Sequence, residues 1–102
     1  MTIYIITDEN HTIGFTGTIK EALILLIIDG WLHLNYHSNE QGLTLAEYLE
    51  IDKDTSEEFL IEMIKEMPKE KIKEILEEFG FTLQEEKIWY YGEYLHNKMW
   101  DT

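Results

Sequence analysis

The sequence contains no cysteine and no arginine, and its 102 residues include a single proline, Pro68. Without cysteine the chain can form neither a disulfide framework nor a thiolate zinc site. Without arginine it lacks the side chain that most often grips phosphates and reads guanine. Eight lysines face 21 acidic residues, which leaves a net charge of −13. These properties argue against nucleic acid and anionic membranes as direct ligands, and they favour a basic protein as partner.

The chain also lacks a long hydrophobic run. Its longest apolar stretch, ALILLII, covers seven residues, 22–28, whereas a helix needs about 20 apolar residues to span a bilayer. The opening residues, MTIYIITDEN, turn acidic at once and lack the basic segment that begins a signal peptide. Because 44% of the residues are apolar, we expect a single folded domain over residues 1–102. Because neither a signal peptide nor a spanning run is evident, we expect this domain in the cytoplasm.

Three segments have the composition of β-strands. Residues 2–7 and 12–16 are rich in β-branched and aromatic side chains, and the turn-forming sequence DENH joins them, so we expect a β-hairpin. In residues 31–37, WLHLNYH, apolar and polar side chains alternate. This alternation is typical of a half-buried strand and predicts the third strand of a sheet.

The pattern Thr-x-x-Glu occurs four times and predicts helix starts, because the threonine can cap the amide three residues further on. The four threonines are Thr18, Thr44, Thr55 and Thr82. The first predicted helix ends at Gly30, where a left-handed glycine is common, and the third ends near Met67. After Thr82 a helical stripe of apolar residues competes with the strand-like sequence KIWYY, and we favour the helix.

Residues 57–80 contain two amphipathic patterns, one on each side of Pro68. Apolar residues follow the spacing i, i+3, i+4, i+7 from Leu60 and again from Ile72. On one straight helix the two faces would differ by about 120°. A break at Pro68 turns both faces to one core, since proline starts a helix well but continues it poorly. The complete prediction is an α+β fold, in which a small antiparallel sheet in ββαβ order packs against several helices.

A glutamate occupies every fourth position through this region. The row consists of Glu58, Glu62, Glu66, Glu70, Glu74 and Glu78. Like charges four residues apart destabilise a helix by about 0.2–0.5 kcal/mol per pair, and residues 40–86 hold 15 acidic residues against five lysines. We interpret the row either as an ordinary solvated face or as a surface that meets a basic partner, with a carboxylate every ~6 Å along each helix.

The C-terminal segment is dense in aromatic side chains. They include Trp89, Tyr90, Tyr91, Tyr94 and Trp100. Packing in a core would account for such a cluster, but Trp and Tyr are also the residues most enriched at binding hot spots. We therefore add Trp89 and Tyr90 to the glutamate row as candidate partner-binding residues.

No residue pattern indicates catalysis or metal binding. His33 and His37 would lie about 13 Å apart on the predicted strand, and no third ligand is evident near them in the sequence. The chain contains no G-x-S-x-G motif, no glycine-rich phosphate loop and no Cys/His pair. We therefore expect no metal site, no cofactor and no enzymatic activity.

Small size, absence of cysteine, richness in Glu, Ile and Lys, and strong negative charge without a catalytic motif resemble the inhibitor proteins carried by phages and other mobile elements. More narrowly, the chain is similar to type II-A anti-CRISPR proteins, several of which are acidic nucleic-acid mimics. The resemblance implies binding to the basic guide-RNA or DNA channel of an RNA-guided effector nuclease, which recognises backbone charge and shape. Two other classes stay open: a structural or assembly partner that uses the aromatic segment as its interface, and a small transcriptional regulator, which the lack of arginine disfavours.

We predict that the chain does not bind nucleic acid directly, because a net charge of −13 without arginine repels phosphates. A gel shift with duplex DNA or RNA at low salt, where electrostatic attraction is strongest, should show no complex at micromolar protein. Sub-micromolar binding would contradict the prediction.

Overall fold

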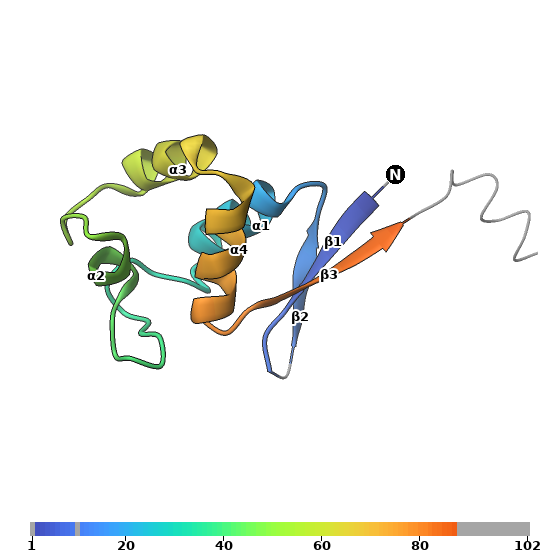
Figure 1. Ribbon diagram of the computed structural model, residues 1–102, viewed down its shortest axis with the longest axis horizontal. Helices are drawn as coiled ribbons and strands as arrows, with labels where there is room; N and C mark the ends of the chain where they lie inside the picture. The colour runs from blue at the N-terminus through green and yellow to red at the C-terminus, as the bar shows by residue number, and fades with distance from the viewer. Residues whose placement is uncertain (1, 10, 88–102) are drawn as a thin grey trace, which may run out of the picture.

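The computed structural model describes residues 2–9 and 11–87, which form one sheet and four helices (Figure 1). The strands are β1 (Thr2–Thr7), β2 (Thr12–Thr16) and β3 (Thr82–Lys87). The helices are α1 (Ile19–Ile28), α2 (Leu45–Leu49), α3 (Glu57–Glu66) and α4 (Lys69–Glu78). The predicted α+β class is confirmed, but two strands, four helices and a last strand follow one another along the chain, in place of the order ββαβ.

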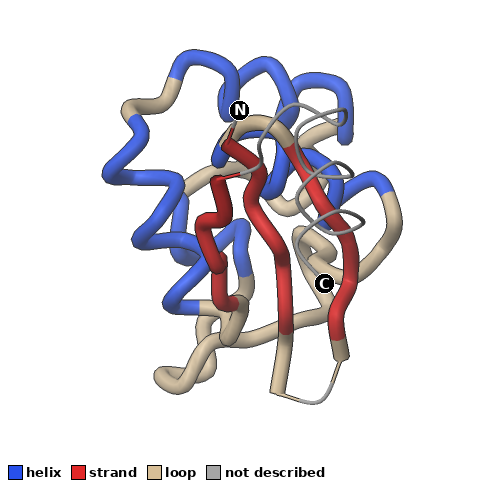
Figure 2. The backbone as a smooth tube through the Cα atoms, turned by 90° about the vertical axis from the view of Figure 1, so that its right-hand side faces the viewer, coloured by secondary structure: helices blue, strands red, loops and turns tan. Residues whose placement is uncertain are grey.

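The sheet is antiparallel with the order β2-β1-β3, so the first strand of the chain is the central one. The predicted hairpin is confirmed: β1 pairs with β2, with Ile6 opposite Gly14, and a bulge follows between Ile6 and Thr7. On its other side β1 pairs with β3 over the full length of both strands. The helices gather on one face of the sheet (Figures 1 and 2).

Helix α1 lies at the centre of the core. It is apolar almost throughout, and it contacts the sheet as well as α3 and α4. Its contact with the sheet is close at Gly14, where a Cβ atom would lie 3.2 Å from Leu25 Cδ2. The helices α3 and α4 add the apolar residues that the two amphipathic patterns predict, and the buried ones are Leu60, Ile64, Ile72, Ile75 and Leu76.

The strand predicted over residues 31–37 is wrong, because these residues form turns after α1. The backbone amide of His33 donates to His37 Nδ1 (3.0 Å), and that of Asn35 donates to His33 Nδ1 (3.1 Å). Side chains thus take amides that a strand would offer to its neighbour. Two of the apolar residues in the alternating pattern, Leu32 and Leu34, are nevertheless buried. Their burial explains why the segment resembles a half-buried strand in sequence.

The third strand of the sheet is β3, in the place where we predicted a helix from Thr82. A helix N-cap contributes only about 1 kcal/mol, whereas residues 82–87 gain an unbroken ladder of pairs with β1. Gly80, in the left-handed conformation at φ 85°, ends α4, and the chain then returns to the sheet. The remainder of the predicted helix, from residue 88 on, lies outside the described residues.

The predicted break at Pro68 is confirmed. Helix α3 ends at Glu66, Met67 and Pro68 have extended backbone with ψ of 144° and 153°, and α4 begins at Lys69. Pro68 is the N-cap residue of α4 rather than its first residue. Because the chain changes direction here, both helices present their apolar faces to α1.

Two of the four predicted threonine caps are confirmed. Thr18 caps α1, and Thr44 forms a complete capping box at the start of α2. The third cap is wrong by one residue, since Ser56 caps α3 while the Thr55 hydroxyl donates to the carbonyl of Asp52 (2.6 Å). A cap pattern therefore locates a helix start here only to within a residue.

Truncating Ile72 should test the core that α1 organises. Ile72 is 0% exposed, whereas Ile28 at the end of α1 is 57% exposed. We expect Ile72→Ala to lower the free energy of unfolding by about 2–4 kcal/mol, and Ile28→Ala by less than about 1 kcal/mol, both measured by urea denaturation. Equal effects of the two substitutions would contradict the assigned core.

Candidate functional site

The glutamate row lies on α3 and α4 and bends with them. Glu58, Glu62 and Glu66 belong to α3, and the other members, Glu70, Glu74 and Glu78, belong to α4. The two helices run in different directions on either side of Pro68 (Figure 1). The row is therefore two short acidic segments that meet at a corner. Five members are exposed, and the last, Glu78, is half-buried.

Three members of the row already have partners in the fold. Glu62 pairs with Lys65 on the same helix (3.1 Å), and Glu74 pairs with Lys71 (3.5 Å). Glu78 accepts a hydrogen bond from the side-chain amide of Asn39 (3.4 Å), a buried residue of the loop before α2. These three carboxylates serve local structure, whatever else they contact.

Glu74 also joins α4 to α2 through Tyr48. The Tyr48 ring packs edge-on against Phe79, with 5.8 Å between ring centroids, and Lys71 Nζ lies 4.9 Å from the Tyr48 centroid. Burial, together with a hydrogen bond to Glu74, raises the pKa of Tyr48 to about 12. The same hydrogen bond, aided by Lys71, lowers the pKa of Glu74. This part of the row therefore holds α2 against α4.

The remaining members, Glu58, Glu66 and Glu70, are exposed. Within residues 2–9 and 11–87 none of the three has an ion-pair or side-chain hydrogen-bond partner. Glu66 and Glu70 stand on either side of the corner at Pro68, and Glu58 lies in the first turn of α3. A basic partner could pair with these carboxylates without breaking an existing ion pair.

An exposed aromatic side chain, Phe59, accompanies the α3 segment. It is 60% exposed, and Glu62 and Glu66 follow it at i+3 and i+7, which places all three on one side of the helix. Sequence analysis missed Phe59 because only the residues that fit the apolar face were considered. The available signal was a large aromatic residue outside that face. We name Glu58, Phe59, Glu66 and Glu70 the corner surface.

The other candidate residues from the sequence give no further site. Trp89 and Tyr90 lie outside the described residues. The backbone amide of His33 donates to the His37 ring, and the His33 ring stacks on Tyr36 with 4.1 Å between ring centroids. The described part of the chain contains no group of three or more His, Cys, Asp or Glu residues able to hold a metal ion.

The comparisons with known proteins add no family to this geometry. No protein-family model, curated protein or solved structure matches the chain. Over residues 2–9 and 11–87, every helix is too short or too polar to cross a membrane. The corner surface is therefore characterised by its chemistry alone, which is that of exposed carboxylates and one exposed aromatic ring.

Replacing Tyr48 with phenylalanine should test the contact between α2 and α4. Removing the hydroxyl should lower the free energy of unfolding by about 1 kcal/mol at pH 8. An unfolded tyrosine ionises near pH 10.0 and folded Tyr48 near pH 12, so the contribution is complete below pH 10 and is lost as pH rises through 12. The difference in unfolding free energy between wild type and Tyr48→Phe should therefore shrink over this range, measured by urea denaturation.

Tyr36→Phe is the matched control, because Tyr36 is 80% exposed. It should leave stability nearly unchanged at pH 8. A Tyr48→Phe effect that stays constant through pH 12 would contradict the assigned hydrogen bond.

Proposed function

We propose that the protein is an inhibitor that binds a basic nucleic-acid channel of another protein, in particular that of a type II CRISPR effector nuclease. The observation that carries the proposal is the corner surface, where Glu58, Glu66 and Glu70 are exposed and have no partner among the described residues, and where the exposed ring of Phe59 follows Glu58 on α3. The choice of effector nuclease as target rests on the resemblance to type II-A anti-CRISPR proteins. No catalytic step is part of the proposal.

Charge supports a channel that normally holds nucleic acid. Such channels carry lysine and arginine residues that track a phosphate backbone, and the net charge of −13 would steer the protein towards them. Electrostatic complementarity acts chiefly on the association rate and on the choice of partner. The carboxylates would thus bring the two proteins together and set their orientation.

Affinity needs more than exposed charge, because exposed ion pairs contribute only about 0.2–1 kcal/mol each. Phe59 supplies an apolar anchor among the carboxylates, and aromatic side chains are common at binding hot spots. On α3 the acidic segment from Glu58 to Glu66 spans about 12 Å at ~1.5 Å per residue, and it then turns at Pro68. The corner surface therefore fits a curved or two-walled basic groove better than a straight one.

Reversing the three free carboxylates tests the proposal. Glu58→Lys, Glu66→Lys and Glu70→Lys together add two charges each, which brings the net charge from −13 to −7. We expect this triple variant to lose at least tenfold in inhibition of guide-RNA or target-DNA loading by a type II-A effector nuclease. The loss should come mainly from the association rate, and it should be larger at low salt.

A second triple variant controls for total charge. Glu9→Lys, Glu40→Lys and Glu50→Lys make the same change at exposed positions away from the corner surface, and this variant should retain most of its inhibition. Phe59→Ala should weaken inhibition at both salt concentrations, because its contribution is not electrostatic. Circular dichroism is used to check that each variant keeps the wild-type fold.

The outcomes separate the alternatives. Failure of the wild-type protein to inhibit would reject the effector nuclease as partner. Equal loss in both triple variants would reject the corner surface in favour of total charge. Undiminished inhibition by both triple variants would reject the corner surface and leave the aromatic segment with Trp89 and Tyr90 as the candidate interface.

A further inference from the structure

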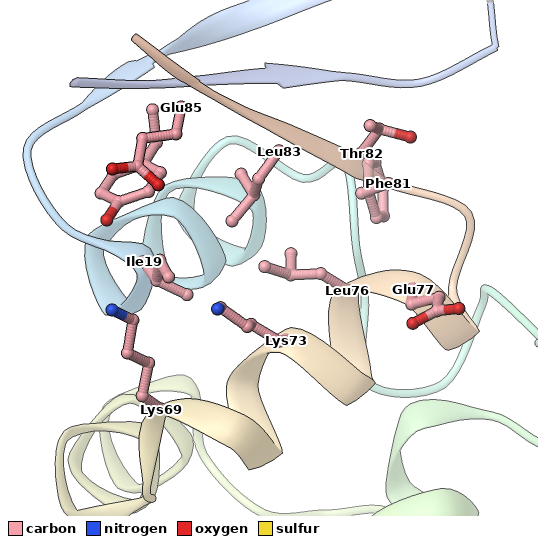
Figure 3. A pocket seen from close by; sticks show the side chains of 10 residues that line it. Ile19, Lys69, Lys73, Leu76, Glu77, Phe81, Thr82, Leu83 and Glu85 are labelled. Carbon is pink, nitrogen blue, oxygen red and sulfur yellow. The ribbon is translucent and has the colours of Figure 1, made fainter. Parts of the chain in front are cut away.

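A groove runs between helix α4 and strand β3, on the side of α4 that faces the sheet (Figure 3). Its volume is about 450 Å³, within the range of about 300–1,000 Å³ that is usual for ligand sites. Apolar side chains from four parts of the chain line it: Tyr4, Ile19, Leu76, Phe81 and Leu83. An apolar groove of this size is a place where a further chain could bury side chains.

Two lysines of α4, Lys69 and Lys73, line the groove and extend from the helix towards it (Figure 3). Lys65 on α3 and Lys71 on α4 form ion pairs, but neither groove lysine does so within the described residues. Like charges four residues apart destabilise a helix, and cations near its N-terminus oppose its dipole. In a chain with 21 acidic residues, two ammonium groups without an ion-pair partner among the described residues can bind a carboxylate.

Strand β3 offers a third feature, a free edge. It pairs only with β1, and the order β2-β1-β3 places it at the border of the sheet. Within residues 2–9 and 11–87 no strand pairs with its outer side. The backbone amides and carbonyls on that side can therefore accept an added strand.

We propose that this groove binds an extended peptide segment of another protein, which adds to β3 as a fourth strand. Alternate side chains of the peptide would enter the apolar groove, and a carboxylate of the peptide would lie between Lys69 and Lys73. Strand addition of this kind gives affinity through main-chain hydrogen bonds and specificity through pockets for alternate side chains. The proposal is independent of the corner surface, which lies on exposed residues of α3 and α4.

Two glutamates limit which peptide fits. Glu77 and Glu85 also line the groove, and Figure 3 shows them at opposite ends of it. They would repel a second carboxylate at either end. The preferred segment therefore alternates in polarity and carries a single charge, one carboxylate near its centre.

The test uses the full chain and a library of synthetic heptapeptides. Apolar residues (Val, Leu, Ile, Phe, Tyr) alternate with Thr, Ser or Asn in each peptide, and each peptide carries one carboxylate, that of a central Asp. The tightest binder is followed by amide NMR at about 0.15 M salt, where the Debye length is ~8 Å. We expect shifts at the amides of β3 and α4, and about tenfold weaker binding when the carboxylate becomes an amide.

Two variants locate the anion site. K69Q/K73Q should weaken the same peptide about tenfold, whereas K53Q/K65Q, with the same change in net charge at exposed positions away from the groove, should bind like wild type. Equal binding by K69Q/K73Q and wild type would overturn the proposal.

Backbone methylation of the peptide tests strand addition. N-methyl groups at the odd positions and at the even positions remove different amide donors, and only one of the two sets should abolish binding, because a strand offers alternate amides to its neighbour. Equal effects of both sets would overturn strand addition. Shifts at β3 that grow with protein concentration without peptide would show a second copy of the chain at this edge, and would also overturn the proposal.

Discussion

Burial of α1 is the constraint on which the other elements depend. The helix is apolar on nearly all sides, so it is stable only when the sheet covers one side and α3 and α4 cover another. Gly14 allows the sheet to approach closely, and the break at Pro68 allows two short helices to turn their apolar faces inward. The polar faces of α3 and α4 are consequently held outward, and this fixes where their carboxylates stand.

Sequence patterns correctly predicted the elements whose structure depends on neighbouring residues. The hairpin, the helix ending before Gly30 and the break at Pro68 each follow from signals within a few residues of one another. The errors arose where distant partners decide the structure. Residues 31–37 alternate like a strand, but side chains within the segment accept hydrogen bonds from its own amides, those of His33 and Asn35. Residues 82–87 carry a helix-start pattern, but the free side of β1 outweighs it.

The candidate surface was predictable in composition but not in detail. Sequence spacing identified all six glutamates of the row, yet it could not show that Glu62, Glu74 and Glu78 are engaged by Lys65, Tyr48 and Asn39. Two of these partners, Tyr48 and Asn39, reach α4 only through tertiary contacts with α2 and the loop before it. The groove under β3 was not predictable at all, since it exists only because the last described strand returns to the first.

The pairing of β1 with β3 joins the two ends of the described chain, which has a consequence for synthesis on the ribosome. The hairpin can form early, because its contacts are local, whereas the burial of α1 waits for α3 and α4. The central strand nevertheless keeps one edge open until residues 82–87 emerge, and such long-range closure is slow relative to local folding. A nascent chain therefore exposes an unpaired edge of β1 until residues 82–87 have emerged and paired with it.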